Sequence, residues 1–142
     1  GTYDGALLID DYAHLPAEIE ATLLGARSHP ALRGKLIAVF QPNRYHRIAT
    51  MADTYRDCFT TADIVVITDV YASGTPKIEG VTGELVVQAI TQAHPHANVV
   101  WAPGRADTVS AVKSVIGTGD VCVSMGCGDI ETFPDDLTGG VL

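Results

Sequence analysis

The side chains of this 142-residue chain that could do chemistry gather in three short segments. Residues 10–14 read Asp-Asp-Tyr-Ala-His, a set able to hold a metal-bound phosphate, a ribose hydroxyl or an amine. Residues 41–47 contain Arg44 and Arg47, which share a face if the segment is helical. Two neighbouring guanidinium groups can bind a carboxylate or phosphate bidentately. Residues 124–129, Ser-Met-Gly-Cys-Gly-Asp, carry glycines that let the backbone approach a ligand closely.

Each segment also has a plainer structural interpretation. The carboxylates can stand near the positive end of a helix, and the arginines can pair with acidic residues elsewhere on the surface. The glycines fit a tight turn equally well. Cys127 has no His or Asn tied to it in sequence, so we interpret it as a small filler, whereas Lys77 in the polar loop 72–80 could reach an anion.

Apolar runs alternate with amphipathic segments and predict the elements that position these side chains. The predicted strands span residues 6–9, 35–40, 63–68, 98–101 and 120–124, because each is short and apolar. The predicted helices span 16–29, a segment starting near Thr50, 82–93 and a segment from Asp107 to Gly117. Thr50 and Asp53 resemble a capping box, and the chain after Phe133 is expected to fray.

Buried strands that alternate with helices are typical of a parallel sheet covered on both faces. We therefore predict the α/β class, with a Rossmann-like three-layer domain whose mostly parallel sheet has five or six strands flanked by helices. Ligands of such sheets bind beyond the carboxyl ends of the strands. The three polar segments all follow predicted strands, so the topology is expected to bring them to one edge.

Composition and missing motifs exclude several classes of function. Nine Lys and Arg stand against 17 Asp and Glu, a formal charge of -8, which disfavours nucleic acid and anionic membranes as partners. Three cysteines without a C-x-x-C pair suggest free thiols in a reducing cytoplasm rather than disulfides or zinc. The sequence lacks a phosphate-binding loop, a dinucleotide fingerprint and a nucleophile elbow.

Five motifs taken in order resemble the C-terminal domain of the Mur ligases. They are residues 10–14 followed by Pro16, residues 41–47 (Gln-Pro-Asn-Arg-Tyr-His-Arg), residues 68–71 (Thr-Asp-Val-Tyr), Gly80-Val81 and residues 126–129 (Gly-Cys-Gly-Asp). The resemblance runs from about Asp10 to Asp129, and the set is specific although no single motif is.

This resemblance implies that residues 1–142 form one domain of a larger, three-domain bacterial cytoplasmic enzyme. Such a ligase uses ATP to phosphorylate the carboxylate of UDP-N-acetylmuramate, and the amine of L-alanine then attacks the acyl phosphate and releases phosphate. The N-terminal and central domains are the implied partners, and the central domain would bind most of the ATP and Mg²⁺. This domain alone would contribute no catalytic residue and no metal ligand. Its implied amino-acid-binding residues are Tyr12, His14, Asn43, Arg44 and Arg47, with Asp11 near the nucleotide.

The sequence departs from the family pattern at four positions. Leu15 and Asn43 stand where the family often has His, His46 stands where Ser is more common, and Cys127 replaces a usual Ala. Asn43 leaves the amino acid open, so a sister ligase that attaches a preformed tripeptide is an alternative.

Two hypotheses of other classes remain. One is a free-standing small-molecule binding module, and the other is a metal-dependent hydrolase using Asp10, Asp11, His14 and His46, although no metal-ligand spacing is evident.

Overall fold

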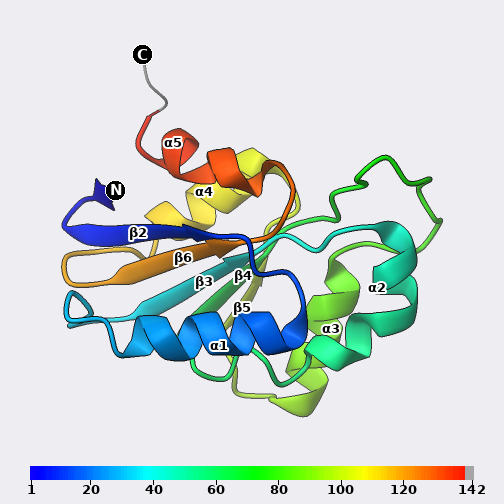
Figure 1. Ribbon diagram of the computed structural model, residues 1–142, viewed down its shortest axis with the longest axis horizontal. Coiled ribbons are helices and arrows are strands. Elements are labelled where there is room, and N and C mark those ends of the chain that lie inside the picture. Colours follow the sequence, from blue (N-terminus) through cyan, green and yellow to red (C-terminus); the bar gives the residue numbers. More distant parts are fainter. Residues whose placement is uncertain (140–142) are drawn as a thin grey trace.

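The computed structural model describes residues 1–139, in which a six-stranded sheet lies between two layers of helices (Figure 1). Along the chain the elements are β1 (Thr2–Tyr3), β2 (Ala6–Asp11), α1 (Pro16–Arg27), β3 (Leu36–Phe40), α2 (Tyr45–Met51), the 3-10 helix η1 (Ala52–Tyr55), β4 (Ile64–Ile67), α3 (Glu84–Ala93), β5 (Val99–Trp101), α4 (Arg105–Lys113), β6 (Val121–Met125), the 3-10 helix η2 (Asp129–Thr132) and α5 (Phe133–Leu137). The predicted α/β class and the flanked, mostly parallel sheet are confirmed.

The strand order is β1-β2-β6-β3-β4-β5, and only β1 runs antiparallel to its neighbour. The last residues of the parallel strands are in register across the sheet: Asp11 with Met125, Met125 with Phe40, Phe40 with Ile67, and Ile67 with Trp101. The loops that follow β2, β6, β3 and β4 therefore leave the sheet side by side at one edge.

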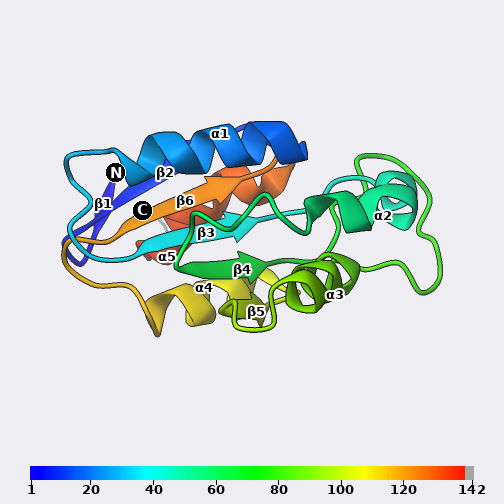
Figure 2. The ribbon, with the colours of Figure 1, turned by 90° about the horizontal axis from the view of Figure 1, so that it is seen from below.

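Each face of the sheet packs against its own layer. Helices α1 and α3 cover one face and α4 and α5 the other, while α2 lies on the side of α1 and α3 beyond the carboxyl ends of the strands, as the two perpendicular views show (Figures 1 and 2). Strand β3 contributes side chains to both faces of the sheet. Ala38 and Phe40 belong to the apolar cluster on the α1 side, Ile37 and Val39 belong to the cluster on the α4 side, and all four are fully buried. A strand buried on both faces explains why its sequence is a continuous apolar run.

Two predicted helix starts are wrong. Helix α2 begins at Tyr45 rather than near Thr50, whose hydroxyl instead donates to the carbonyls of His46 and Arg47 (3.2 and 3.3 Å). Helix α4 has Gly104 at its N-cap, and Asp107 caps from the third helical position by accepting the Gly104 N–H at 2.9 Å. A local capping pattern identifies a helix terminus but does not by itself place the first residue.

The segment after Phe133 was expected to fray, and this is wrong for residues 133–137. They form α5, because Phe133 and Leu137 are buried against the sheet and the Arg105 guanidinium donates to Asp136 at 2.7 Å. Residues 140–142 lie outside the described part of the chain. Among residues 1–139, no helix has the length and apolar character needed to cross a bilayer.

Candidate functional site

The carboxyl edge of the sheet brings together all three segments that sequence reasoning selected. Helices α1 and α2, which follow β2 and β3, lie on one face, whereas η2 and α5, which follow β6, lie on the other. Since β6 stands between β2 and β3, the chain turns toward one face of the sheet after β2 and β3 and toward the other face after β6. Such switch points create the crevices in which α/β proteins bind ligands.

The loop after β2 is held in place by its own hydrogen bonds. The Asp11 carboxylate accepts the N–H of Ala13 at 2.8 Å. Glu18 accepts the N–H groups of His14 and Leu15 at 3.1 and 3.0 Å, and these two bonds hold the pKa of Glu18 below its ordinary value. The His14 ring meets the Tyr12 ring edge to face at 5.8 Å, while Tyr12 itself is 70% exposed.

Asp10 is differently placed. Burial raises its pKa above the ordinary value, although the Ser124 hydroxyl donates to its carboxylate at 3.2 Å and opposes that effect. Glu131 and Asp11 add like charge nearby, which favours the neutral acid further. Asp10 therefore lies beside β6 rather than with the arginines of the β3 loop.

The loop after β3 turns sharply into α2. The backbone of Asn43 forms an isolated bridge with Tyr71, and the Arg44 N–H donates to the Tyr71 carbonyl at 2.8 Å. Arg44 is the N-cap of α2 with a φ of 66°, a conformation that non-glycine residues rarely adopt. Strain of this kind concentrates at functional sites.

Two polar atoms are buried without a hydrogen-bond partner among residues 1–139: Asn43 Oδ1 in this loop and Arg47 Nη1 in the first turn of α2. Asn43 is 3% exposed. The Arg47 guanidinium lies close enough to Tyr55 and Glu18 to lower the pKa of each, although burial, the larger effect, raises the pKa of Tyr55 to about 12. A buried donor and a buried acceptor left open at a crevice require an explanation, and a bound ligand supplies one.

Tyr55 connects the arginine loop to the β2 loop. Its hydroxyl donates to the His14 carbonyl at 2.8 Å, so Arg47, Tyr55 and His14 lie together. Tyr55 was not among the candidate site residues selected from the sequence. A buried tyrosine needs a partner for its hydroxyl, and that requirement was the available signal.

The glycine turn after β6 is shaped by protein contacts. A Cβ on Gly126, whose φ is 148°, would lie 2.9 Å from the Ile130 side chain, and one on Gly128 would lie 2.5 Å from the Tyr71 ring. The close approach predicted for these glycines therefore occurs against neighbouring loops. This packing of the glycine turn places Cys127 Sγ 2.9 Å from Asn43 Nδ2, a contact that was not predicted from the sequence.

The structure thus joins His14, Asn43 and Arg47, with Tyr12 at the exposed margin. Arg44 is exposed beside them at the start of α2, and Asp11 lines a surface hollow with Tyr12 and Glu18. Asp10, Asp11, His14 and His46 do not form a metal-binding group, and residues 1–139 contain no cluster of three or more His, Cys, Asp or Glu able to hold a metal ion. The hydrolase hypothesis lacks the ligand cluster on which it depends.

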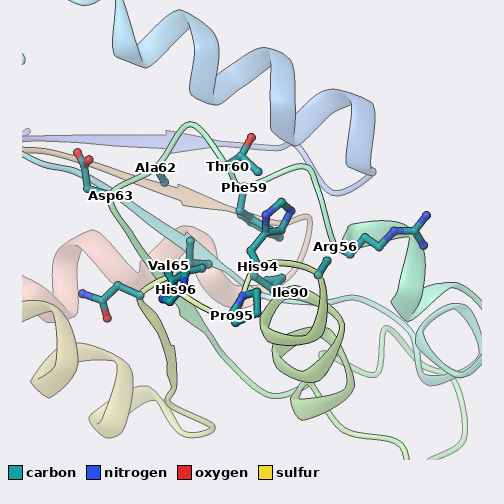
Figure 3. Close-up of a pocket in the computed structure, with 13 residues that line it drawn as sticks. Arg56, Phe59, Thr60, Ala62, Asp63, Val65, Ile90, His94, Pro95 and His96 are labelled. Atoms are coloured by element: carbon teal, nitrogen blue, oxygen red, sulfur yellow. The ribbon is translucent and has the colours of Figure 1, made fainter.

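A separate cavity of about 540 Å³ opens at the opposite edge of the sheet (Figure 3). Phe59, Val65 and Ile90 give it an apolar lining, with His94 and His96 among its polar residues. Residues of the carboxyl-edge loops do not contribute to its wall.

Comparison with known proteins decides the family. Residues 1–128 match the family model described as "Mur ligase, glutamate ligase domain". The chain belongs to the Mur ligase family. The resemblance inferred from the five motifs is thereby confirmed.

Relatives of this Mur ligase chain include the UDP-N-acetylmuramate–L-alanine ligases of Rickettsia prowazekii, 42% identical over 136 residues, and of Rickettsia rickettsii, 41% identical over 138 residues. Each match covers 95–96% of this chain, whereas the chain spans about 28% of the length of either relative.

Solved structures share the fold. UDP-N-acetylmuramate-alanine ligase of Thermotoga maritima matches 94% of this chain and 26% of its own chain, with a TM-score of 0.71 and 21% identity. The murein peptide ligase of Psychrobacter arcticus matches 100% of this chain and 29% of its own, with a TM-score of 0.75 and 23% identity.

Proposed function

We propose that this chain is the C-terminal domain of a three-domain, ATP-dependent ligase that joins L-alanine to UDP-N-acetylmuramate. The observation that carries the proposal is a pair of buried atoms without a hydrogen-bond partner among residues 1–139, Arg47 Nη1 in α2 as a donor and Asn43 Oδ1 in the loop before it as an acceptor. An α-amino acid offers the matching groups, a carboxylate for the guanidinium and an N–H for the amide oxygen. The names of the relatives at 41–42% identity support alanine as that amino acid.

In this proposal the chain holds and orients the nucleophile. Arg47 and Arg44 bind the alanine carboxylate, while Tyr12 and His14 border the same site. Fixing the amino acid in this way leaves its amine directed at the acyl phosphate that ATP forms from the muramate carboxylate. Orientation of two reactants can lower a barrier by roughly 7–11 kcal/mol at best.

Nucleotide and sugar binding belong mostly to the rest of the ligase. The Asp11 carboxylate is proposed to lie near the ATP ribose, because Oδ1 is engaged by Ala13 while Oδ2 has no protein partner among residues 1–139. The donor set of the described residues does not fit Mg²⁺, so the central domain is proposed to hold it. Since the reaction needs ATP and a nucleotide sugar, the bacterial cytoplasm is the proposed location.

The proposal is tested by phosphate release from the full-length gene product. With ATP and UDP-N-acetylmuramate present, release should depend on L-alanine. Release that depends instead on a tripeptide would favour the sister ligase. A full-length product without either activity would favour a binding module and refute the ligase assignment.

A further inference from the structure

The amide group of Asn43 is held through its nitrogen, while its oxygen has no hydrogen-bond partner among residues 1–139. Its Nδ2 donates to Cys127 Sγ at 2.9 Å and to Ser73 Oγ at 3.4 Å. Its Oδ1 is buried and has no partner among residues 1–139. An amide held by its nitrogen presents its oxygen in one direction, and leaving a buried acceptor unpaired is costly unless a ligand donates to it.

The support under Cys127 is rigid. Gly126 and Gly128 flank it, and added Cβ atoms at these positions would collide with Ile130 and the Tyr71 ring. Asn43 is anchored from the other direction, because its backbone bridges Tyr71. Tyr71 therefore contacts both sides of the pair and fixes the distance between the thiol and the amide.

We propose that Asn43 Oδ1 accepts an N–H of the incoming amine and that Cys127 is a positioning residue that holds the amide in this orientation. This inference rests on the proposed function and assigns the amine end of that same site. A carbonyl oxygen repels a carboxylate and accepts a hydrogen bond from an amine. Asn43 therefore recognises the amine end of the amino acid, to which the Arg47 guanidinium, a donor only, cannot bind. Holding one N–H also directs the nitrogen lone pair away from the amide.

The test compares L-alanine with propionate, which keeps the carboxylate and the methyl group and lacks the amine. In the full-length ligase, Asn43→Leu should raise the KM for L-alanine about tenfold and leave the inhibition constant of propionate within about twofold. Arg47→Met should weaken both, because both ligands carry the carboxylate. Equal losses for alanine and propionate in Asn43→Leu would overturn the amine assignment.

Cys127 is tested by a conservative pair of variants. Cys127→Ala should raise the KM for L-alanine roughly three- to fivefold with unchanged KM for ATP, and Cys127→Ser should restore it, since a hydroxyl oxygen can accept from Nδ2. If Cys127→Ala folds with an unchanged melting temperature and an unchanged KM for L-alanine, the positioning role is refuted. An inactive wild-type enzyme would refute the proposed function itself, and the inference with it, whereas the outcomes above refute the inference alone.

Discussion

Replacing Arg47 with methionine should make the protein more stable and a worse enzyme at once. The Nη1 atom is buried without a hydrogen-bond partner among residues 1–139, so part of the charged group is desolvated with no compensating bond. Methionine keeps a long, flexible apolar stem and removes that cost. Substitution of a residue with a purely structural role would not raise stability and lower activity together.

The structure sets the size of both effects. An unsatisfied buried polar group costs about 1–3 kcal/mol. Because the rest of Arg47 is half-buried, the lower half of that range applies, and the free energy of unfolding should rise by about 1–2 kcal/mol. Binding loses a charge-assisted bond of about 1.5–3 kcal/mol, which corresponds to a 10- to 150-fold higher KM for L-alanine.

Urea unfolding of the chain and alanine-dependent phosphate release by the full-length ligase measure the two quantities. Arg56→Met is the matched control, because Arg56 is exposed and pairs with Asp53 at 2.6 Å and Asp57 at 3.6 Å. The control should leave the KM unchanged and reduce stability by about 0–1 kcal/mol. A destabilised Arg47→Met protein with a normal KM would show that Arg47 serves the fold and that the carboxylate role is wrong.

Three further predictions follow from single groups. Arg44→Gly should be about 1 kcal/mol more stable than Arg44→Ala in urea unfolding, because only glycine relaxes the φ of 66°. Burial opposes ionisation of Asp120, but hydrogen bonds from Lys35 and Gly117 outweigh it and lower the pKa, so the stabilisation is present above the unfolded-state value and is lost as the pH falls through the folded one. Asp120→Asn should therefore lose about 2 kcal/mol at neutral pH, and the difference from wild type should shrink below about pH 4; a constant difference would contradict this. Iodoacetamide at about pH 8 should label Cys127, which is partly exposed, and spare Cys58 and Cys122, because burial raises the pKa of each to about 12; peptide mass mapping of modified Cys58 or Cys122 would disprove it.

The central strands β3, β4 and β6 could be predicted from the sequence because they are buried on both faces. Ile64–Ile67 and Val121–Met125 are almost entirely apolar, a pattern that surface helices do not show. The start of α2 could not be predicted, because the turn before it depends on the bridge between Asn43 and Tyr71, 28 residues apart in the chain. Helix α5 was missed because tertiary burial of Phe133 and Leu137 overrides a Pro- and Asp-rich local sequence.

The candidate site was predictable as a set of segments but not as a set of contacts. The alternation of elements predicts a parallel sheet, and the rule on carboxyl ends then places Arg47 and His14 at one edge of it. The contact of Asn43 with Cys127 joins residues 84 positions apart, and it arises from strand register and glycine packing. From the sequence alone we interpret Cys127 as a small filler. In the structure its sulfur contacts the amide of Asn43, which we propose it positions.

The donor and the acceptor that we propose for the amino acid lie at one strand-to-helix turn, Asn43 within it and Arg47 in the first turn of α2. The Gln41 N–H donates to the Met125 carbonyl at 3.0 Å, which fixes one end of the turn to the sheet, and α2 fixes the other. The spacing between Arg47 Nη1 and Asn43 Oδ1 is thus determined within this chain, before any contact with another domain. In the proposed function, Tyr12, 70% exposed at the margin, is the part of the site left for a neighbouring domain to cover. Orientation of the amino acid would then be a property of this domain, whereas exclusion of water from the acyl phosphate would require closure.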